Sequence, residues 1–129
     1  MTASPHALYR AWTDRFDAWF AAPGLVQMRA AVGEPFVFQT KYQGALHTHY
    51  GRFLNLLPDR LVEMTWMTGG EGTAGAETVV RVEFEARSPG TRLRLTHSGF
   101  YDEAGVRRHD QAWERHVLPH LDEVLRNEE

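Results

Sequence analysis

The sequence predicts an α+β fold in which a curved antiparallel sheet packs against one long C-terminal helix, with two short helices before the sheet. Three observations support this prediction. Ser4-Pro5 is a typical helix start close to the N-terminus. From Glu34 to Phe100, apolar residues recur at every second position in segments separated by short turns. In the last quarter of the chain they recur every three to four positions, as on one face of a helix.

Two short helices are expected before the sheet. Ser4 is the N-cap of the first, and Pro5 lies in its first turn, where the missing N–H costs no hydrogen bond. This helix extends to about Thr13. Asp14 is interpreted as a second N-cap, and it opens a short helix with the apolar residues Phe16, Trp19 and Phe20. Pro23-Gly24 ends that helix, and residues 25–33 have no clear pattern.

The middle of the chain predicts five antiparallel strands joined by short connections. Turns are expected at Gln43-Gly44, Pro58-Asp59 and Ser88-Pro89-Gly90, and the glycine-rich stretch 69–77 is expected to be a flexible loop. The expected strands are 34–42, 46–56, 61–67, 78–87 and 91–100. Hairpin-linked strands with one polar face form a sheet with one side in water, so the other side needs a cover.

The C-terminal helix is the only long amphipathic segment that can cover this sheet. Its apolar face consists of Trp113, Val117, Leu121, Val124 and Leu125. A proline within this pattern, Pro119, removes one backbone hydrogen bond and crowds the carbonyl of Arg115. We therefore expect a bend in the helix at this point.

The stretch RLVEMTW (60–66) predicts what lies between sheet and helix. Its apolar residues alternate with Glu63 and Thr65, so the side chains of Met64 and Trp66 point inward, towards the helix. The space between them is either a filled core or a small cavity. On the opposite, solvated face we expect the carboxylates Glu63, Glu83 and Glu85, paired across strands with Arg81, Arg92 and Arg94.

The composition limits the classes of function. With 129 residues, the chain is expected to form one domain, 1–129. A net charge of −3 gives no electrostatic basis for binding nucleic acid or an anionic membrane. The absence of cysteine excludes disulfides and thiolate chemistry. The opening MTASPHALYRAW has neither a basic segment nor a long apolar run, so we expect no signal peptide, no membrane span and a cytoplasmic location.

Histidines are the candidate chemical groups. His47 and His49 share one face of a strand, and His116 and His120 are four apart on the helix, but neither pair comes with a third ligand. We therefore expect no metal and no other cofactor. His97 continues the inward stripe of Leu93 and Leu95. Its ring either orients a ligand by one hydrogen bond or is a core histidine bonded to a backbone carbonyl or a tyrosine.

Four segments resemble a known superfamily. They are AWTDRFDAWF (11–20), GRFLNLLPDRLVEMTW (51–66), GTRLRLTHSGF (90–100) and QAWERHVLPHL (111–121). In this order they resemble the START-like superfamily, also called SRPBCC or Bet v 1-type, and within it the branch of homologues of the activator of heat-shock protein 90 ATPase. The resemblance covers nearly the whole chain. It implies one START-like domain with a helix-grip fold, in which sheet and C-terminal helix enclose an apolar cavity.

The resemblance also implies a site. Members bind lipids, sterols or polyketides, and a minority catalyse cyclisation or hydrolysis. Carried over to this chain, the resemblance places Trp19, Trp66, His97 and Trp113 around the cavity. Together with the inward-facing positions, the expected cavity lining is Trp19, Phe36, Phe38, Met64, Trp66, Val82, Phe84, Leu95, His97, Trp113, Val117 and Leu121.

One departure from the superfamily pattern concerns assembly. Members usually begin with a strand before the Ser-Pro helix, whereas three residues precede Ser4 here. We therefore expect the first strand to be missing. The bare sheet edge that this leaves favours a homodimer.

Three functions remain open. The first is a binding domain that holds an apolar or aromatic small molecule between sheet and helix. The second is a co-chaperone-like or regulatory interaction module with a filled core, whose chaperone partner is implied by the resemblance alone. The third is a cyclase- or hydrolase-like enzyme that uses His97. Catalysis would need a carboxylate or hydroxyl partner beside His97. The carboxylates Asp102, Glu103 and Asp110 lie just beyond its strand in sequence.

Overall fold

The computed structural model describes residues 1–21, 24, 26–42, 44–68, 73, 75–100 and 103–127. Along these residues the elements are α1 (Pro5–Ala11), the short 3₁₀ helix η1 (Phe16–Ala18), β1 (Val26–Gln27), β2 (Pro35–Tyr42), β3 (Ala45–Leu57), β4 (Leu61–Thr68), β5 (Thr78–Ala86), β6 (Thr91–Ser98), α2 (Glu103–Ala112), the π-helical turn η2 (Trp113–Val117) and α3 (Leu118–Asn127). The strands form one antiparallel sheet in the order β1-β2-β3-β4-β5-β6.

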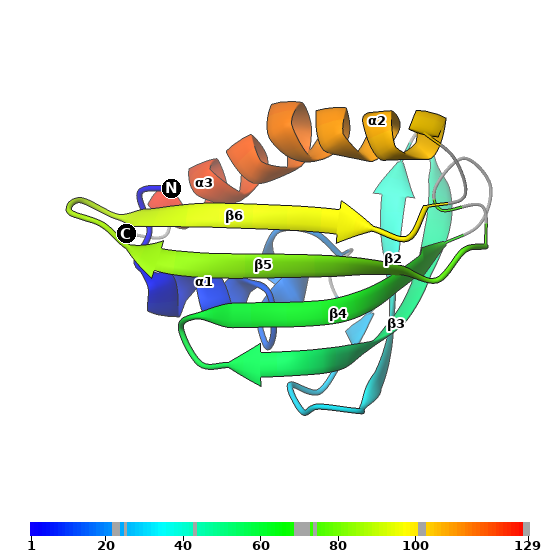
Figure 1. Ribbon diagram of the computed structural model, residues 1–129, viewed down its shortest axis with the longest axis horizontal. Helices are drawn as coiled ribbons and strands as arrows, with labels where there is room; N and C mark the ends of the chain where they lie inside the picture. The colour runs from blue at the N-terminus through cyan, green and yellow to red at the C-terminus, as the bar shows by residue number, and fades with distance from the viewer. Residues whose placement is uncertain are drawn as a thin grey trace.

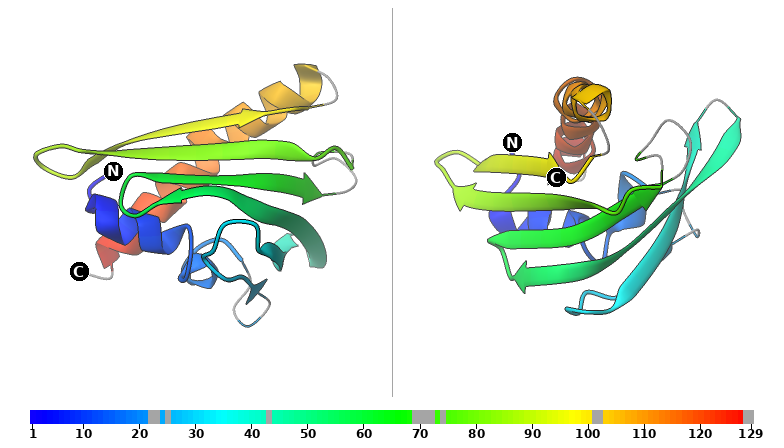
Figure 2. Two further views of the ribbon diagram at one scale, coloured as in Figure 1. Left: turned by 60° about the horizontal axis from the view of Figure 1, so that its bottom comes forward. Right: turned by 45° about the vertical axis from the view of Figure 1, so that its right-hand side comes forward.

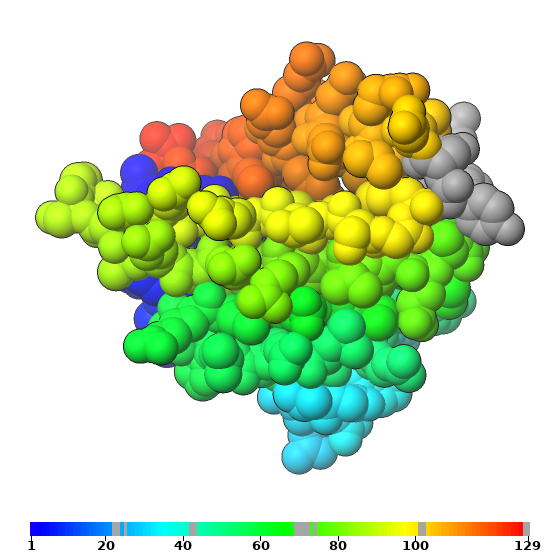
Figure 3. Space-filling model, viewed as in Figure 1, coloured from blue at the N-terminus to red at the C-terminus, as the bar shows by residue number. Residues whose placement is uncertain are grey.

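The sheet curls around the helical elements. Figure 1 shows the strands side by side with the long helix α2–η2–α3 running along the β6 side, and the right-hand view of Figure 2 shows the sheet curving beneath that helix. In the space-filling view the atoms of the long helix lie directly against those of β6 (Figure 3). The predicted α+β helix-grip arrangement is confirmed.

The prediction of five strands was wrong by one. β1 lies in the segment 25–33, for which the sequence has no clear pattern, and it pairs with β2 at Val26↔Phe38 and Gln27↔Val37. A strand of two residues is too short to display an alternating pattern. In the described part of the chain no strand precedes α1, as expected. Instead, the carbonyl of Met1 accepts a hydrogen bond from the backbone N–H of Thr91, at the start of β6 (3.0 Å).

The N-terminal helices follow the sequence prediction in part. The hydroxyl of Ser4 caps α1 by accepting a hydrogen bond from the N–H of Ala7 (3.2 Å), as predicted. The prediction of Asp14 as a second N-cap was wrong: η1 begins after Arg15 without a side-chain cap. The carboxylate of Asp14 instead lies 3.5 Å from the guanidinium of Arg10, four residues earlier, in an exposed ion pair. Pro23, the expected end of this helix, lies outside the described residues.

The strands begin and end close to the predicted residues, and two of the predicted connections are only partly covered. Gln43 of the expected Gln43-Gly44 turn lies outside the described residues, as do 69–72 and 74 of the expected loop 69–77. Thr73, within that loop, is buried, and its hydroxyl binds both the N–H and the carbonyl of Thr68 at the end of β4.

The curvature of the sheet is concentrated where β3 passes β4. The register shifts between Phe53 and Asn55, and the N–H of Arg52 bonds to the hydroxyl of Thr65 (2.9 Å) instead of to a backbone carbonyl. At Gly51 the two strands approach so closely that a Cβ would overlap the carbonyl oxygen of Thr65 and lie 2.6 Å from the ring of Phe36. Such irregularities bend a strand, and here they allow β2 and β3 to fold over the helices.

The long helix responds to Pro119 by widening one turn. The N–H of Leu118 bonds to the carbonyl of Trp113, five residues earlier, so Trp113–Val117 is a π-helical turn. A proline at position 119 cannot donate to the carbonyl of Arg115, and a wider turn accommodates the missing bond and the bulk of the ring. The predicted irregularity is therefore present, and Figure 1 shows the helix changing direction between α2 and α3.

The two faces of the sheet differ as predicted. Val62, Met64 and Trp66 are buried against the helical elements, and the rings of Trp66 and Trp113 have centroids 5.7 Å apart. On the outer face, Arg81 binds Glu63 across the strands (3.1 Å) and Glu83 along its own strand (3.3 Å). The register places Arg94 opposite Glu83 and Arg92 opposite Glu85, but the carboxylate of Glu85 is bound by Arg87 (3.3 Å).

Replacing Gly51 by alanine tests the origin of the curvature. The added methyl group has to push β3 away from the backbone of β4, so we expect Gly51→Ala to lower the free energy of unfolding by ~1–3 kcal/mol. Urea titration followed by tryptophan fluorescence measures this change. A matched control is Gly44→Ala, because a Cβ there meets no atom within 4 Å and only the positive φ of 77° opposes it. Equal stability of Gly51→Ala and the wild type would contradict this account.

Candidate functional site

The space between the concave face of the sheet and the helices holds a set of aromatic rings, which we call the inner aromatic cluster. Neighbouring rings have centroids 4.8–6.4 Å apart, mostly in tilted or edge-to-face geometry. Its members are Trp12, Phe16, Trp19, Phe20, Phe38, Trp66 and Trp113. They come from α1, η1 and the residues beside them, from two strands and from the long helix, so the cluster joins every layer of the fold.

The residues predicted to line a cavity are mostly inside the molecule. All are buried except Leu95 and Val117, which are half-buried. Ring contacts bring together Trp19, Phe38, Trp66, His97 and Trp113, through the cluster. Phe36 lies beside Phe38 and Phe53 at the edge of this group. Phe84 lies at the far end of the sheet, where it contributes to a groove on the outside.

His97 forms a complete chain of hydrogen bonds. The indole Nε1–H of Trp113 donates to Nδ1 of His97 (3.1 Å), and Nε2 of His97 lies 2.7 Å from the hydroxyl of Thr78. That hydroxyl also contacts the backbone carbonyl of Trp66. Because Nδ1 accepts, the neutral ring carries its proton on Nε2. The ring therefore donates to Thr78, whose hydroxyl in turn donates to Trp66.

Burial, together with the nearby ring of His109, lowers the pKa of His97 to about 3. With both ring nitrogens engaged, His97 has no free nitrogen to accept a proton or to bind a ligand directly. Glu103 and Asp110 are exposed, and Asp102 lies outside the described residues. The geometry thus gives His97 the partners of a core histidine, although these are a hydroxyl and an indole instead of the carbonyl or tyrosine considered from the sequence.

Unlike His97, His49 has a ring nitrogen without a hydrogen-bond partner among the described residues. Its ring stacks on Phe38 with centroids 4.7 Å apart and an interplanar angle of 7°, and it also contacts Trp66 and Phe20. Its Nδ1 is buried, and no described residue forms a hydrogen bond with it in ordinary geometry. Burial lowers the pKa of His49 to about 4, against a smaller opposing effect of the backbone of His47. The sequence showed only that His49 shares a strand face with His47, because strand alternation alone does not show which rings cover it.

A second buried polar atom lacks a partner within the described chain. Nε1 of Trp12 is an N–H donor on a ring with no exposed surface, and no described group accepts from it. Trp12 contacts Trp113, which contacts Phe20, which in turn contacts His49. The two unsatisfied nitrogens therefore lie at opposite ends of one run of aromatic rings. Buried polar groups without partners are uncommon in folded proteins, and each one calls for an explanation.

The histidine pairs considered as metal ligands do not gain a third ligand in the structure. Over the described ranges, no group of three or more histidine, aspartate or glutamate side chains is placed to hold a metal ion. Nε2 of His120 lies 3.1 Å from the carbonyl of Trp19. His116 lies in the π-helical turn, whereas His120 lies in the regular helix α3.

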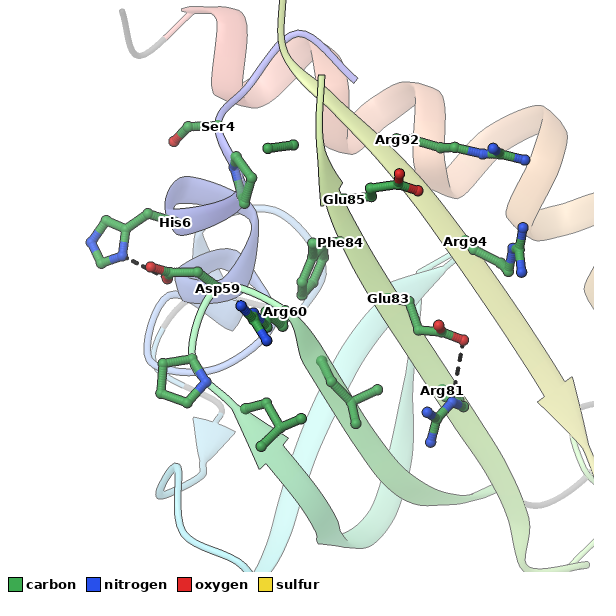
Figure 4. A pocket seen from close by; sticks show the side chains of 15 residues that line it. Ser4, His6, Asp59, Arg60, Arg81, Glu83, Phe84, Glu85, Arg92 and Arg94 are labelled. Atoms are coloured by element: carbon green, nitrogen blue, oxygen red, sulfur yellow. Dashed lines mark hydrogen bonds and ion pairs between the residues drawn. The ribbon is translucent and has the colours of Figure 1, made fainter. Parts of the chain in front are cut away.

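A groove of about 900 Å³ opens on the outside of the molecule, at the end of the sheet next to α1 (Figure 4). We call it the arginine groove, because Arg60, Arg81, Arg92 and Arg94 line it together with apolar residues from the turn between β3 and β4. Its charged walls belong to the solvated face of the sheet, so the sheet separates them from the inner aromatic cluster. The sequence predicted these charges but not the hollow, which depends on how α1 sits against the strands.

Comparison with known proteins identifies the family. A family model described as Activator of Hsp90 ATPase homolog 1-like protein matches residues 2–126. The chain belongs to this family. The resemblance inferred from the four sequence segments is thereby confirmed. Comparison with curated proteins finds no match.

Solved structures with the same fold come from several bacteria. Protein CV1439 from Chromobacterium violaceum is 21% identical, with a TM-score of 0.76 over 94% of this chain and 88% of that one. Protein MLL2253 from Mesorhizobium loti is also 21% identical, with a TM-score of 0.75 over 100% and 93%. The Aha1 dimer from Colwellia psychrerythraea, solved in solution, is 21% identical, with a TM-score of 0.65 over 94% and 87%. These likenesses show the fold.

No helix in the described residues of this family member is long and apolar enough to cross a membrane.

The buried histidines predict a pH dependence of stability. Folded-state pKa values of about 4 for His49 and about 3 for His97 lie below the unfolded value of 6.5. Below pH 6.5 the unfolded chain therefore binds protons that the folded chain does not, and stability falls as the pH falls towards these values. Between pH 7 and pH 5, each ring contributes a loss of about 2 kcal/mol.

Urea unfolding of His49→Phe at both pH values tests this prediction. The variant keeps an aromatic ring on Phe38 but removes one titrating group, so we expect it to lose about 2 kcal/mol less than the wild type between pH 7 and pH 5. His116→Asn is the control, because His116 is exposed and should keep the wild-type slope. A slope for His49→Phe equal to that of the wild type would show that His49 is not held neutral by the fold.

Proposed function

We propose that this protein binds a small aromatic or apolar molecule that carries one or two polar groups, between the concave face of the sheet and the long helix. The observation that supports this most directly is a pair of buried, unsatisfied nitrogens: Nε1 of Trp12, within the inner aromatic cluster, and Nδ1 of His49, whose ring packs against that cluster. Ligand sites are mostly apolar, with a few placed polar groups that fix orientation. A ligand hydroxyl donating to His49, or a ligand oxygen accepting from Trp12, would satisfy these atoms.

Binding requires one ring of the cluster to move, and the structure favours Phe20. Its ring lies among Trp66, Trp113, Phe38 and His49. Phe20 is half-buried, whereas Trp66, Trp113 and Phe38 are buried. It also follows a helix of only three residues, η1, while its neighbours stand on strands or on the long helix. A ligand ring that takes the place of Phe20 would be enclosed by the same aromatic walls.

In the proposed site, His97 would have a supporting part. Its hydrogen bond fixes the indole of Trp113, and Thr78 ties the ring to the backbone of β4. The alternative in which His97 catalyses a reaction is disfavoured, because both ring nitrogens are engaged and the described carboxylates near it in sequence are exposed. The proposed role is therefore binding, without chemistry at this residue.

A comparison of two probes tests this function. We expect 2-naphthol, which has a fused aromatic ring and one hydroxyl, to bind the wild type and quench its tryptophan fluorescence. Naphthalene lacks the hydroxyl and should bind about tenfold more weakly, since one buried hydrogen bond is worth ~1–1.5 kcal/mol. In His49→Phe the preference for 2-naphthol should disappear.

His47→Phe is the matched control for this experiment, because His47 lies two residues away on the same strand but is exposed. It should keep the preference for the hydroxyl. Failure of both probes to bind up to their solubility limits would argue for a filled core that takes no ligand. Equal affinity for the two probes would show that His49 plays no part in recognition.

A second candidate function is a protein-interaction module, including self-association. It is favoured by the family, whose description refers to activation of a chaperone ATPase, and by the Aha1 dimer from Colwellia psychrerythraea. β6 is the last strand in the sheet order, and within the described chain its outer edge pairs with other backbone only at Thr91. A strand edge without backbone partners can pair with a second copy.

Sedimentation velocity tests self-association. If the edge of β6 pairs with a second copy, the sedimentation coefficient should rise with protein concentration towards that of a dimer. A coefficient that stays at the monomer value up to high concentration would contradict the dimer.

A further inference from the structure

The arginine groove carries unpaired positive charge, although the net charge of the chain is negative. Its carboxylates are already engaged: Asp59 lies 2.9 Å from His6, and Glu83 lies 3.3 Å from Arg81. Glu85 is held by Arg87 at 3.3 Å. In contrast, Arg60, Arg92 and Arg94 have no carboxylate within 4.0 Å among the described residues. This local positive excess stands in a chain whose net charge is −3.

The arrangement explains why these arginines are unpaired. Arg92 and Arg94 lie directly opposite Glu85 and Glu83 in the register of β5 and β6. Both carboxylates, however, are bound by arginines of their own segment of chain, Arg87 and Arg81. Figure 4 shows Arg92 and Arg94 extending from the same side of β6, with Glu83 bonded to Arg81 on the neighbouring strand. Two guanidinium groups are thus left facing solvent at the rim of a hollow.

The groove is lined by exposed apolar residues as well as by these arginines. Leu57 is 52% exposed, and Pro58 beside it is exposed as well. Together with Pro5 of α1, they contribute apolar lining to the groove. The volume of about 900 Å³ is at the upper end of the range for ligand pockets, which leaves room for a short segment of polypeptide.

We propose that the arginine groove binds an extended acidic segment of a partner protein, in which two carboxylates two residues apart pair with Arg92 and Arg94 and an apolar side chain rests on Leu57. The spacing supports this choice. Arg92 and Arg94 are two residues apart on one strand, so their side chains leave the sheet ~6.6 Å apart. Residues two apart in an extended peptide project from one side with the same separation, and guanidinium pairs with carboxylate in a fixed, two-bond geometry.

This proposal is independent of the inner aromatic cluster, because the charged strands of the groove present their outer face. The groove could bind a protein segment whether or not the interior holds a small molecule. Exposed ion pairs are individually weak and are screened by salt. Binding should therefore be modest, should need the apolar contact as well as the charges, and should weaken as the salt concentration rises.

Fluorescence anisotropy with a labelled peptide containing the acidic stretch Asp-Leu-Asp-Leu-Asp tests the proposal. We expect saturable binding to the wild type, at least tenfold weaker binding of the same peptide with asparagine in place of each aspartate, and at least tenfold weaker binding of the acidic peptide to Arg92→Gln/Arg94→Gln. The matched control is Arg107→Gln/Arg126→Gln, which removes the same charge from the long helix, outside the groove. It should change the affinity less than twofold.

The remaining outcomes decide against the proposal. Equal binding of the acidic and the neutral peptide would show that the arginines do not select carboxylates. An equal loss in both double variants would assign the effect to overall charge. A peptide with phosphoserine in place of aspartate that binds while the aspartate peptide does not would make the groove a phosphate site instead. The far-ultraviolet circular dichroism spectrum and the thermal midpoint of each variant confirm that the fold is retained, since both arginines are exposed.

Discussion

The contact between Trp66 on the sheet and Trp113 on the long helix is the interaction on which the rest of the structure depends. Their rings, 5.7 Å apart, bring the two largest elements together, and the aromatic residues of α1, η1 and the turns beside them close around that contact. The packing of these rings is irregular because indole and phenyl rings prefer edge and tilted contacts over parallel stacking. Large, flat aromatic groups pack well in an interior but offer few hydrogen-bond partners. A buried polar atom among them is satisfied only where a hydrogen-bonding group lies within reach.

His97 and His49 show both sides of that constraint. His97 lies where Trp113 and Thr78 can reach both of its nitrogens, and the resulting chain of hydrogen bonds ties helix to sheet. His49 lies on the same inner surface, yet its neighbours are aromatic carbons, and its Nδ1 stays without a partner in the described chain. Two residues of one type, both held neutral by burial, therefore differ: His97 links the helix to the sheet, whereas His49 keeps a buried nitrogen without a partner in the described chain.

We propose a different kind of recognition for each face of the sheet. The concave face is apolar and enclosed, which suits a small molecule, whereas the convex face carries charges in water beside an open hollow, which suits an exposed segment of another protein. Irregular backbone gives the two faces their shape. The close approach at Gly51 and Thr65 curls the sheet, and the π-helical turn before Pro119 lets the long helix follow that curve while keeping Trp113 inside.

Patterns local to the chain determined the fold class, the Ser4 cap, the inward direction of Met64 and Trp66 and the solvated carboxylates. These features follow from spacing within one element, and the four family segments lie in the same elements. Only the tertiary structure decided that residues 26–27 form strand β1 and that Asp14 pairs with Arg10. It also decided that both ring nitrogens of His97 are hydrogen-bonded, that Nδ1 of His49 has no partner in the described chain, and that Arg92 and Arg94 pair with no described carboxylate. Most of these depend on which side chains far apart in sequence meet, and on which of several nearby arginines takes a given carboxylate. Alternation and helical spacing describe one element at a time, whereas hydrogen bonds and ion pairs are settled by competition among all the groups that the fold brings within reach.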